Sequence, residues 1–149
     1  MDLKKIVAIS GYPEIFKVVK EARKGLIVES LQTGKRMQAF LSYKMSSLED
    51  IAIFTDEGDM PLKEVFRRIW EKENGGNAPD PKNMSQDEVK KYFEQILPEY
   101  DRERVYISDM KKVLRWYNML LDKGLMNFDE EKEEESKEEK QENNQDSQS

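Results

Sequence analysis

The spacing of apolar residues changes near residue 59, and this change restricts the folds open to the chain more than any other feature. Before it, short runs rich in β-branched residues alternate with polar positions and are separated by turn signals roughly every 8–12 residues. Beyond it, apolar residues recur three and four positions apart, which is the period of an amphipathic helix. The chain is therefore expected to be an α+β protein, in which a small antiparallel sheet is followed by helices.

Five short strands are expected within residues 1–58. Ser46 and Glu49 are three residues apart, a capping-box spacing that predicts a single helical turn before the last strand. This layout is typical of an SH3-like β-barrel, which closes a sheet on itself and limits its exposed edges. An OB-type barrel is the competing interpretation. The expected strands are 6–9, 15–22, 26–30, 36–40 and 51–55.

Helices are expected in the second half of the chain. A bridging helix over residues 59–74 is indicated by an apolar stripe from Leu62 to Trp70. Residues 75–84 hold two glycines and two prolines, which are typical of a linker. A helical domain is predicted over residues 85–126, with Ser85 as the N-cap of its first helix, a second helix from Ser108, and Gly124 at the end of that helix.

The last segment, residues 127–149, differs from the rest in composition. Residues 129–149 contain ten acidic residues, three lysines and no apolar residue. Such a segment cannot bury enough apolar surface to offset the entropy lost on ordering, so a disordered acidic tail is predicted. Subtracting its charge of −7 from the total of −6 leaves +1 for residues 1–128.

The composition also excludes several kinds of chemistry. The chain has no cysteine and no histidine, so it lacks disulfides, thiolate zinc sites and the Ser-His and Cys-His pairs of many hydrolases. We therefore expect a protein that is not an enzyme and needs no cofactor or metal. The N-terminus lacks the apolar run of a signal peptide, and no apolar run approaches the ~20 residues of a membrane span, so a soluble cytoplasmic protein is predicted.

Three phrases carry a family resemblance: "VESLQTGKRMQAF", "SSLEDIAIFTDEGDMPLKEVF" and "YFEQILPEYDRERVYISDMKKVLRWYNMLL". In these phrases the chain resembles a bacterial family of uncharacterised proteins, over most of residues 3–125. The resemblance implies a small SH3-like barrel domain followed by a short helical domain. The family has no established activity, so the resemblance implies no site residues.

The leading functional hypothesis is a protein-interaction module that binds an unknown protein partner at the loop end of the barrel. Tyr12, which precedes a proline in a loop, and Tyr43, which lies between two strands, are expected to be partly exposed. The Lys35–Arg36 turn is read first as the tip of a hairpin and second as a binding loop. The candidate binding residues are Tyr12, Lys17, Arg23, Lys24, Lys35, Arg36, Tyr43 and Lys44.

Two alternatives stay open at this point. Residues 1–45 carry nine basic and four acidic residues, so they could bind RNA or single-stranded nucleic acid through a basic face with exposed aromatics. A carboxylate-dependent enzyme is the third hypothesis, based on acids between Glu49 and Asp59. Acids at 56–59 are also favoured by the start of the following helix, for structural reasons alone.

Overall fold

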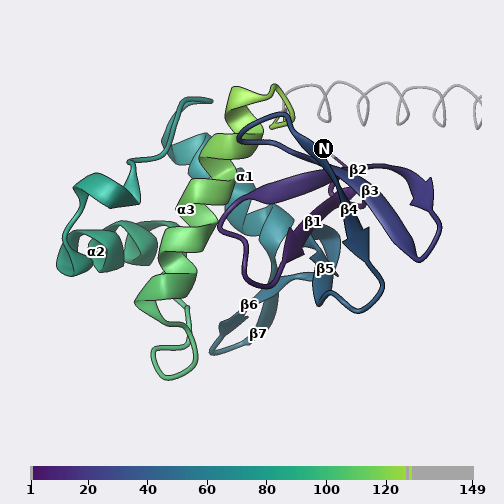
Figure 1. Cartoon of the computed structure of the whole chain (residues 1–149). Coiled ribbons are helices and arrows are strands. Elements are labelled where there is room, and N and C mark those ends of the chain that lie inside the picture. Colours follow the sequence, from purple (N-terminus) through teal and green to yellow (C-terminus); the bar gives the residue numbers. More distant parts are fainter. Residues whose placement is uncertain (1, 127, 129–149) are drawn as a thin grey trace, which may run out of the picture.

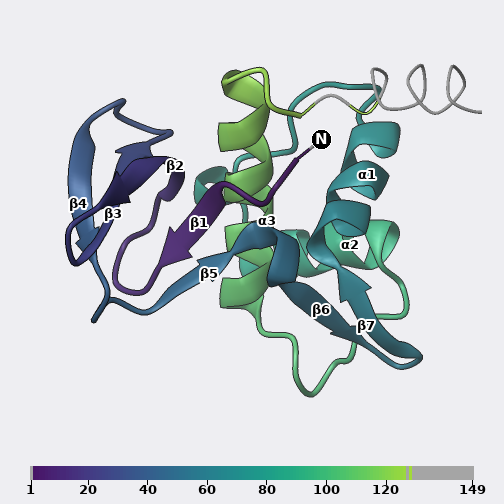
Figure 2. The same ribbon diagram turned by 90° about the vertical axis from the view of Figure 1, so that its right-hand side faces the viewer.

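The computed structural model describes residues 2–126 and 128. Apart from Phe128, the predicted disordered tail lies outside the described residues. The described chain is a mixed α+β protein with a five-stranded antiparallel sheet, a two-stranded sheet and three α-helices. Figure 1 shows the helices beside the strands of the main sheet, and the turned view in Figure 2 places α3 between β1 and the other two helices.

The main sheet follows the alternation of apolar and polar residues in the first half of the chain. Its strand order is β4-β3-β2-β1-β5, and all neighbours are antiparallel. The register between β2 and β3 shifts between Val18 and Lys20, which is a bulge in the longest strand. The strands are β1 (Ile6–Ile9), β2 (Ile15–Ala22), β3 (Gly25–Ser30), β4 (Arg36–Phe40) and β5 (Met45–Ser47).

One glycine allows β3 and β4 to approach closely. A Cβ atom on Gly25 would collide with the backbone carbonyl of Ala39 on β4. The turn before it is tight, since Lys24 adopts a left-handed conformation with φ of 67°.

The first four strands were predicted within one residue of their observed bounds.

The expected fifth strand and the expected closure of the barrel require correction. The fifth strand of the sheet is Met45–Ser47, which pairs with β1. The helical turn η1 (Leu48–Asp50) precedes the strand formed by residues 52–55, as predicted, but that strand is not part of the main sheet. Within the described residues, β4 and β5 each have one neighbour, so hydrogen bonding does not close the sheet. The physical reason is that the residues expected to close it, 51–55, pair elsewhere.

Those residues form β6 (Ala52–Thr55), which pairs with β7 (Gly58–Pro61) in a hairpin. The hairpin is held by the segment that follows α2. The amide of Asp56 donates to the Glu99 carbonyl (2.9 Å), and the amide of Asp101 donates to the Phe54 carbonyl (3.0 Å). The β6–β7 hairpin therefore packs with the helical part of the chain.

The helices are α1 (Leu62–Lys72), α2 (Gln86–Ile96) and α3 (Ile107–Asp122), with a 3₁₀ turn η2 (Pro81–Asn83) before α2. The bridging helix begins at Leu62 and not at residue 59, because residues 58–61 belong to β7. Ser85 caps α2 as predicted, with its Oγ accepting from the Glu88 amide (3.2 Å). Among the described residues, no helix is long and apolar enough to cross a bilayer.

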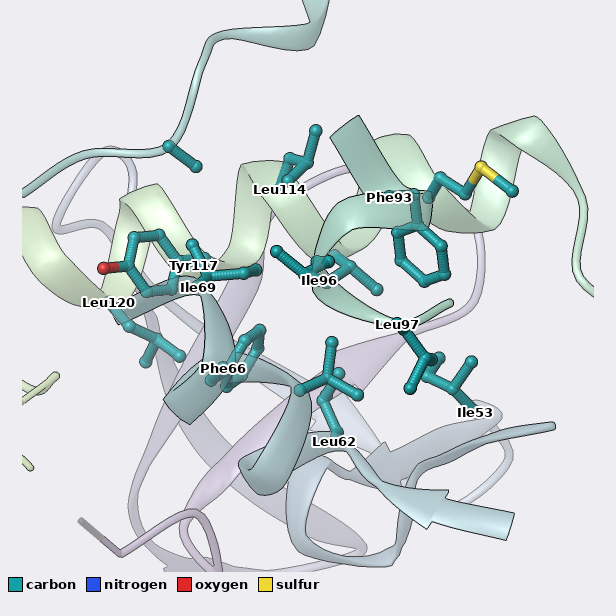
Figure 3. Packing of buried hydrophobic residues seen from close by; sticks show 14 of the residues in the cluster. Ile53, Leu62, Phe66, Ile69, Phe93, Ile96, Leu97, Leu114, Tyr117 and Leu120 are labelled. Atoms are coloured by element: carbon teal, nitrogen blue, oxygen red, sulfur yellow. The ribbon is translucent and has the colours of Figure 1, made fainter. Parts of the chain in front are cut away.

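The principal core lies where the three helices meet each other and one face of the sheet. Leu62, Phe66 and Ile69 of α1 face Phe93 and Ile96 of α2 and Leu114, Tyr117 and Leu120 of α3 (Figure 3). A second, smaller cluster lies within the curl of the main sheet and is centred on Val7, Phe16 and Val28. Burial on both faces explains why β1 and the start of β2 are almost continuously apolar.

Candidate functional site

A groove runs along α3 where this helix faces the β1–β2 turn and the start of β6. It consists of three adjoining hollows, which we name the apolar pocket (about 200 Å³), the basic pocket (about 500 Å³) and the distal hollow (about 510 Å³). Ile51, Lys112 and Trp116 line both the apolar and the basic pocket. Pro13 and Arg115 line both the basic pocket and the distal hollow. We refer to the three together as the α3 groove.

The apolar pocket is a small recess between β6 and the first turns of α3. Its volume is below the ~300–1,000 Å³ of typical small-molecule sites, so it matches one side chain better than a whole ligand. Arg104 forms part of its wall and stacks on Phe54, with the guanidinium carbon 4.1 Å from the ring centroid. The pocket is lined mainly by Ile51, Ile53, Leu62, Val105, Val113 and Trp116.

Asp101 fixes the loop that carries Arg104. Its carboxylate accepts hydrogen bonds from Arg104 Nε (2.9 Å) and from the amides of Glu103 (2.9 Å) and Arg104 (3.2 Å). These bonds hold the pKa of Asp101 below its usual value, and the bond from the Arg104 side chain has the largest effect. The wall of the apolar pocket is therefore held by a charged loop.

The basic pocket contains donors and aromatic rings but no carboxylate. Lys44, Lys112 and Arg115 line it, and none of the three forms an ion pair in the part of the chain that the structure describes. Tyr12 is 40% exposed and packs the edge of its ring against Phe16, with centroids 5.5 Å apart. Trp116 is half-buried between this pocket and the apolar pocket. The pocket can thus accept an anion and a flat or apolar group together.

Local sequence explains how these side chains come together. Lys112, Arg115 and Trp116 are three and four residues apart, so they share one face of α3, and Trp116 lies at the margin of this face where it also packs against the principal core. On the opposite side of the groove, the amide of Ser10 donates to the Lys44 carbonyl (2.9 Å), which joins the β1–β2 turn to the entry of β5. Gly11 lies in the β1–β2 turn, and its φ of 92° is a conformation that glycine adopts without strain.

The distal hollow differs from the basic pocket in its charge. Its lining includes Asp80 and Asp122 as well as Lys82 and Arg115. Asn118 joins α3 to the linker at this end, because it accepts from the Ala78 amide (2.9 Å) and donates to the Ala78 carbonyl (3.1 Å). This hollow therefore has no excess of either charge, and we give it no role.

Two of the eight residues predicted from the sequence, Tyr12 and Lys44, line the basic pocket. The other six line none of the three hollows of the α3 groove. Lys17 lies on β2, Arg23 and Lys24 form the β2–β3 turn, and Lys35 and Arg36 lie at the β3–β4 turn, where Arg36 pairs with Glu29 (3.3 Å). Tyr43 packs edge-on against Phe40 and against the cluster within the curl of the sheet.

Lys112, Arg115 and Trp116 were not among the binding residues predicted from the sequence. The available signal was two cations and a tryptophan on one helical face, outside the apolar stripe. Nothing in the sequence indicated that this face lies opposite Tyr12 and Lys44. Within residues 2–126 and 128, no three acidic side chains are grouped so that they could hold a metal ion.

Comparison with known proteins identifies relatives of unknown function. Residues 3–48 match the domain of unknown function DUF5606, and residues 51–120 match the domain of unknown function DUF6852. The solution NMR structure of a protein from Bacteroides vulgatus, a target of the Northeast Structural Genomics Consortium, is 41% identical with a TM-score of 0.70. That similarity covers 85% of this chain and 91% of the other. Comparison with curated proteins found no relative.

Proposed function

This chain belongs to the same family of uncharacterised bacterial proteins as the Bacteroides vulgatus protein. Because the family has no established activity, we propose a function from the geometry of the α3 groove. We propose that the protein is a non-enzymatic binding module that holds a short extended segment of a partner protein in the α3 groove. The partner segment places one aliphatic or aromatic side chain in the apolar pocket and an acidic group in the basic pocket.

One observation carries this proposal: a pocket sized for a single side chain directly adjoins a pocket whose cations form no ion pair within residues 2–126 and 128. Protein interfaces are commonly anchored by a few side chains in desolvated pockets, surrounded by polar contacts. Trp116 separates the two pockets and contacts both, and tryptophan and arginine are enriched at such anchor sites. A small-molecule enzyme site would require one larger enclosed cavity with convergent polar groups.

We also infer that the main sheet is an open relative of SH3-like barrels. Three features support this finer assignment: the meander β1–β4, the return of β5 to β1, and a 3₁₀ turn beside β5. The apolar cluster within the curl of the sheet supports it as well. In this arrangement the β1–β2 turn is a loop that presents Tyr12 to a partner.

Nucleic-acid binding remains the second candidate, and the combination of Tyr12 and Trp116 with three cations favours it locally. The wider charge distribution favours a peptide. Arg23–Lys24 and Lys35–Arg36 lie at opposite ends of the six-residue strand β3, which separates them by roughly 20 Å. The basic residues of the first 45 positions therefore do not form one continuous track for a phosphate backbone.

Peptide display against the full chain tests the proposal. Selected peptides are expected to carry an aliphatic or aromatic residue near an acidic one. Binding should weaken at least about tenfold, or about 1.4 kcal/mol, in a Lys112→Glu/Arg115→Glu variant, because two cations that face the acidic group of the partner are replaced by anions. The matched control is Arg23→Glu/Lys24→Glu, which makes the same charge change outside the groove and should bind normally. Equal loss in both variants would contradict a specific site.

The salt dependence distinguishes the two candidates. A single-stranded oligonucleotide bound through several phosphates should lose affinity steeply between 50 and 200 mM salt, whereas a peptide with one apolar anchor should lose much less. Tight oligonucleotide binding that is lost in the Lys112/Arg115 variant would favour the nucleic-acid function over the peptide function.

A further inference from the structure

We infer that the basic pocket is a phosphate-binding subsite and that the partner segment carries a phosphate monoester on a side chain. This inference rests on the proposed function and specifies the chemistry of the partner. The site consists of Lys44, Lys112 and Arg115, with the hydroxyls of Ser10 and Ser46 beside them.

Every charged group in the lining of this pocket is a hydrogen-bond donor. The ammonium groups of Lys44 and Lys112 and the guanidinium of Arg115 have no ion-pair partner in residues 2–126 and 128. The hydroxyls of Ser10 and Ser46 likewise make no hydrogen bond to that part of the chain. A ligand with several acceptor oxygens on one atom would satisfy these donors simultaneously.

The charge of the pocket favours a monoester over the other common anions. Three cations face one hollow, and a phosphate monoester brings a charge of about −1.5 to −2 at pH 7 with three acceptor oxygens. A carboxylate brings one negative charge and two acceptor oxygens, and so does each phosphodiester group of a nucleic acid. Either of these anions would leave two of the three cations without a counter-charge from the ligand. Arg115 adds a planar fork of donors that fits two phosphate oxygens at once.

The neighbouring rings and the apolar pocket define the rest of the ligand. Tyr12 and Trp116 provide apolar surface on either side of the hollow, suited to the chain next to the phosphorylated residue. Because the apolar pocket shares Lys112 and Trp116 with the basic pocket, an aliphatic side chain a short distance along the same segment reaches it. The preferred ligand is thus a phosphorylated residue close to an aliphatic one.

The absence of histidine makes pH a direct probe of this ligand. The second pKa of a phosphate monoester is about 6, so the dianion forms between about pH 5.5 and 7.5. Histidine is the side chain whose ordinary pKa lies in this interval, and the protein contains no histidine. The charged groups facing the hollow are Lys44 beside β5 and Lys112 and Arg115 on α3. Acids line the two adjoining hollows: Asp109 in the apolar pocket, and Asp80 and Asp122 in the distal hollow. Affinity for the phosphopeptide should therefore rise across this interval, while affinity for a carboxylate peptide should not.

The test uses the full chain and three degenerate peptide libraries with phosphoserine, serine or glutamate fixed at the centre. We expect the phosphoserine library to be retained roughly tenfold or more above the serine library, and glutamate to fall between them. Retention should be lost in Lys112→Gln/Arg115→Gln and kept in the matched Arg23→Gln/Lys24→Gln variant. Circular dichroism of all variants is the control for folding.

The outcomes separate this inference from the proposed function. Equal retention of the phosphoserine and serine libraries, still dependent on Lys112 and Arg115, would overturn the phosphate subsite and leave the peptide groove standing. Retention of no library would overturn both. Phosphopeptide binding that is the same at pH 5.5 and 7.5 would also contradict recognition of the dianion.

Discussion

The guanidinium of Arg104 lies over the ring of Phe54, 4.1 Å from its centroid, and thereby joins the loop before α3 to strand β6. Phe54 is 39% exposed, so this contact covers an aromatic ring that would otherwise face solvent. The same pair forms one wall of the apolar pocket. The shape of the pocket therefore depends on Asp101, which fixes Arg104 in place.

Replacement of Asp101 by Asn tests this loop through its pH dependence. The folded-state pKa of Asp101 is lowered, so its contribution to stability is present above the unfolded value, near pH 4, and is lost as pH falls through the folded value. The wild type should have the higher melting temperature at pH 7, and the difference from Asp101→Asn should shrink by pH 3. Thermal unfolding followed at both pH values measures this. An unchanged difference would mean that the charge of Asp101 has no role in the loop.

The hydroxyl of Tyr117 makes a second testable connection, between α3 and the linker that follows α1. Tyr117 is fully buried, and its Oη donates to the Gly76 carbonyl (2.8 Å). Tyr117→Phe should cost roughly 1–2 kcal/mol at pH 7, because the Gly76 carbonyl loses its partner. Urea unfolding measures the loss. Tyr12→Phe is the control, since the Tyr12 hydroxyl makes no hydrogen bond within the described residues, and it should change stability little.

Alkaline unfolding provides a further readout of Tyr117. Burial, with the nearby charge of Glu73, raises the pKa of Tyr117 to about 12. For a raised pKa, the contribution to stability is complete below the unfolded value of about 10 and is lost as pH rises from there toward 12. Tyr117→Phe should flatten the fall in stability over this interval. A fall equal to that of the wild type would contradict the assigned environment.

Much of the helical part could be predicted because its signals are local. Ser85 and Glu88, followed by the apolar stripe of α2, predict that helix and its cap, and both are present. The first four strands follow equally from alternation and turn residues. These features depend on residues close together in sequence, for which propensity and periodicity are informative.

The remaining features depend on contacts distant in sequence. Residues 45–47 were not predicted as the fifth strand because three residues carry no periodic pattern. Residues 58–61 gave no strand signal either, since glycine and proline usually mark turns, yet they pair with β6. The α3 groove could not be predicted either, because it depends on how α3 packs beside β1. That packing places Trp116 and Tyr12 in the lining of the same pocket.

The close approach of β3 and β4 leads to a prediction about Gly25. Gly25→Ala should destabilise the protein by on the order of 3 kcal/mol, because the added methyl group meets the backbone carbonyl of Ala39, which no side-chain rotation relieves. Urea unfolding measures the change. Lys20→Ala, at an exposed position of β2 in the same sheet, is the control and should remain within about 0.5 kcal/mol of the wild type. A tolerated alanine at residue 25 would contradict the observed register of β3 on β4.

The position of a bound peptide tests the central claim most directly. In a titration of the isotope-labelled full chain with a display-selected peptide, followed by two-dimensional amide NMR, the largest shift changes should fall at Gly11, Tyr12, Lys112 and Arg115 and at the indole N–H of Trp116. Saturable changes concentrated instead at the Arg23–Lys24 or Lys35–Arg36 turn would place the binding site elsewhere and contradict the α3 groove.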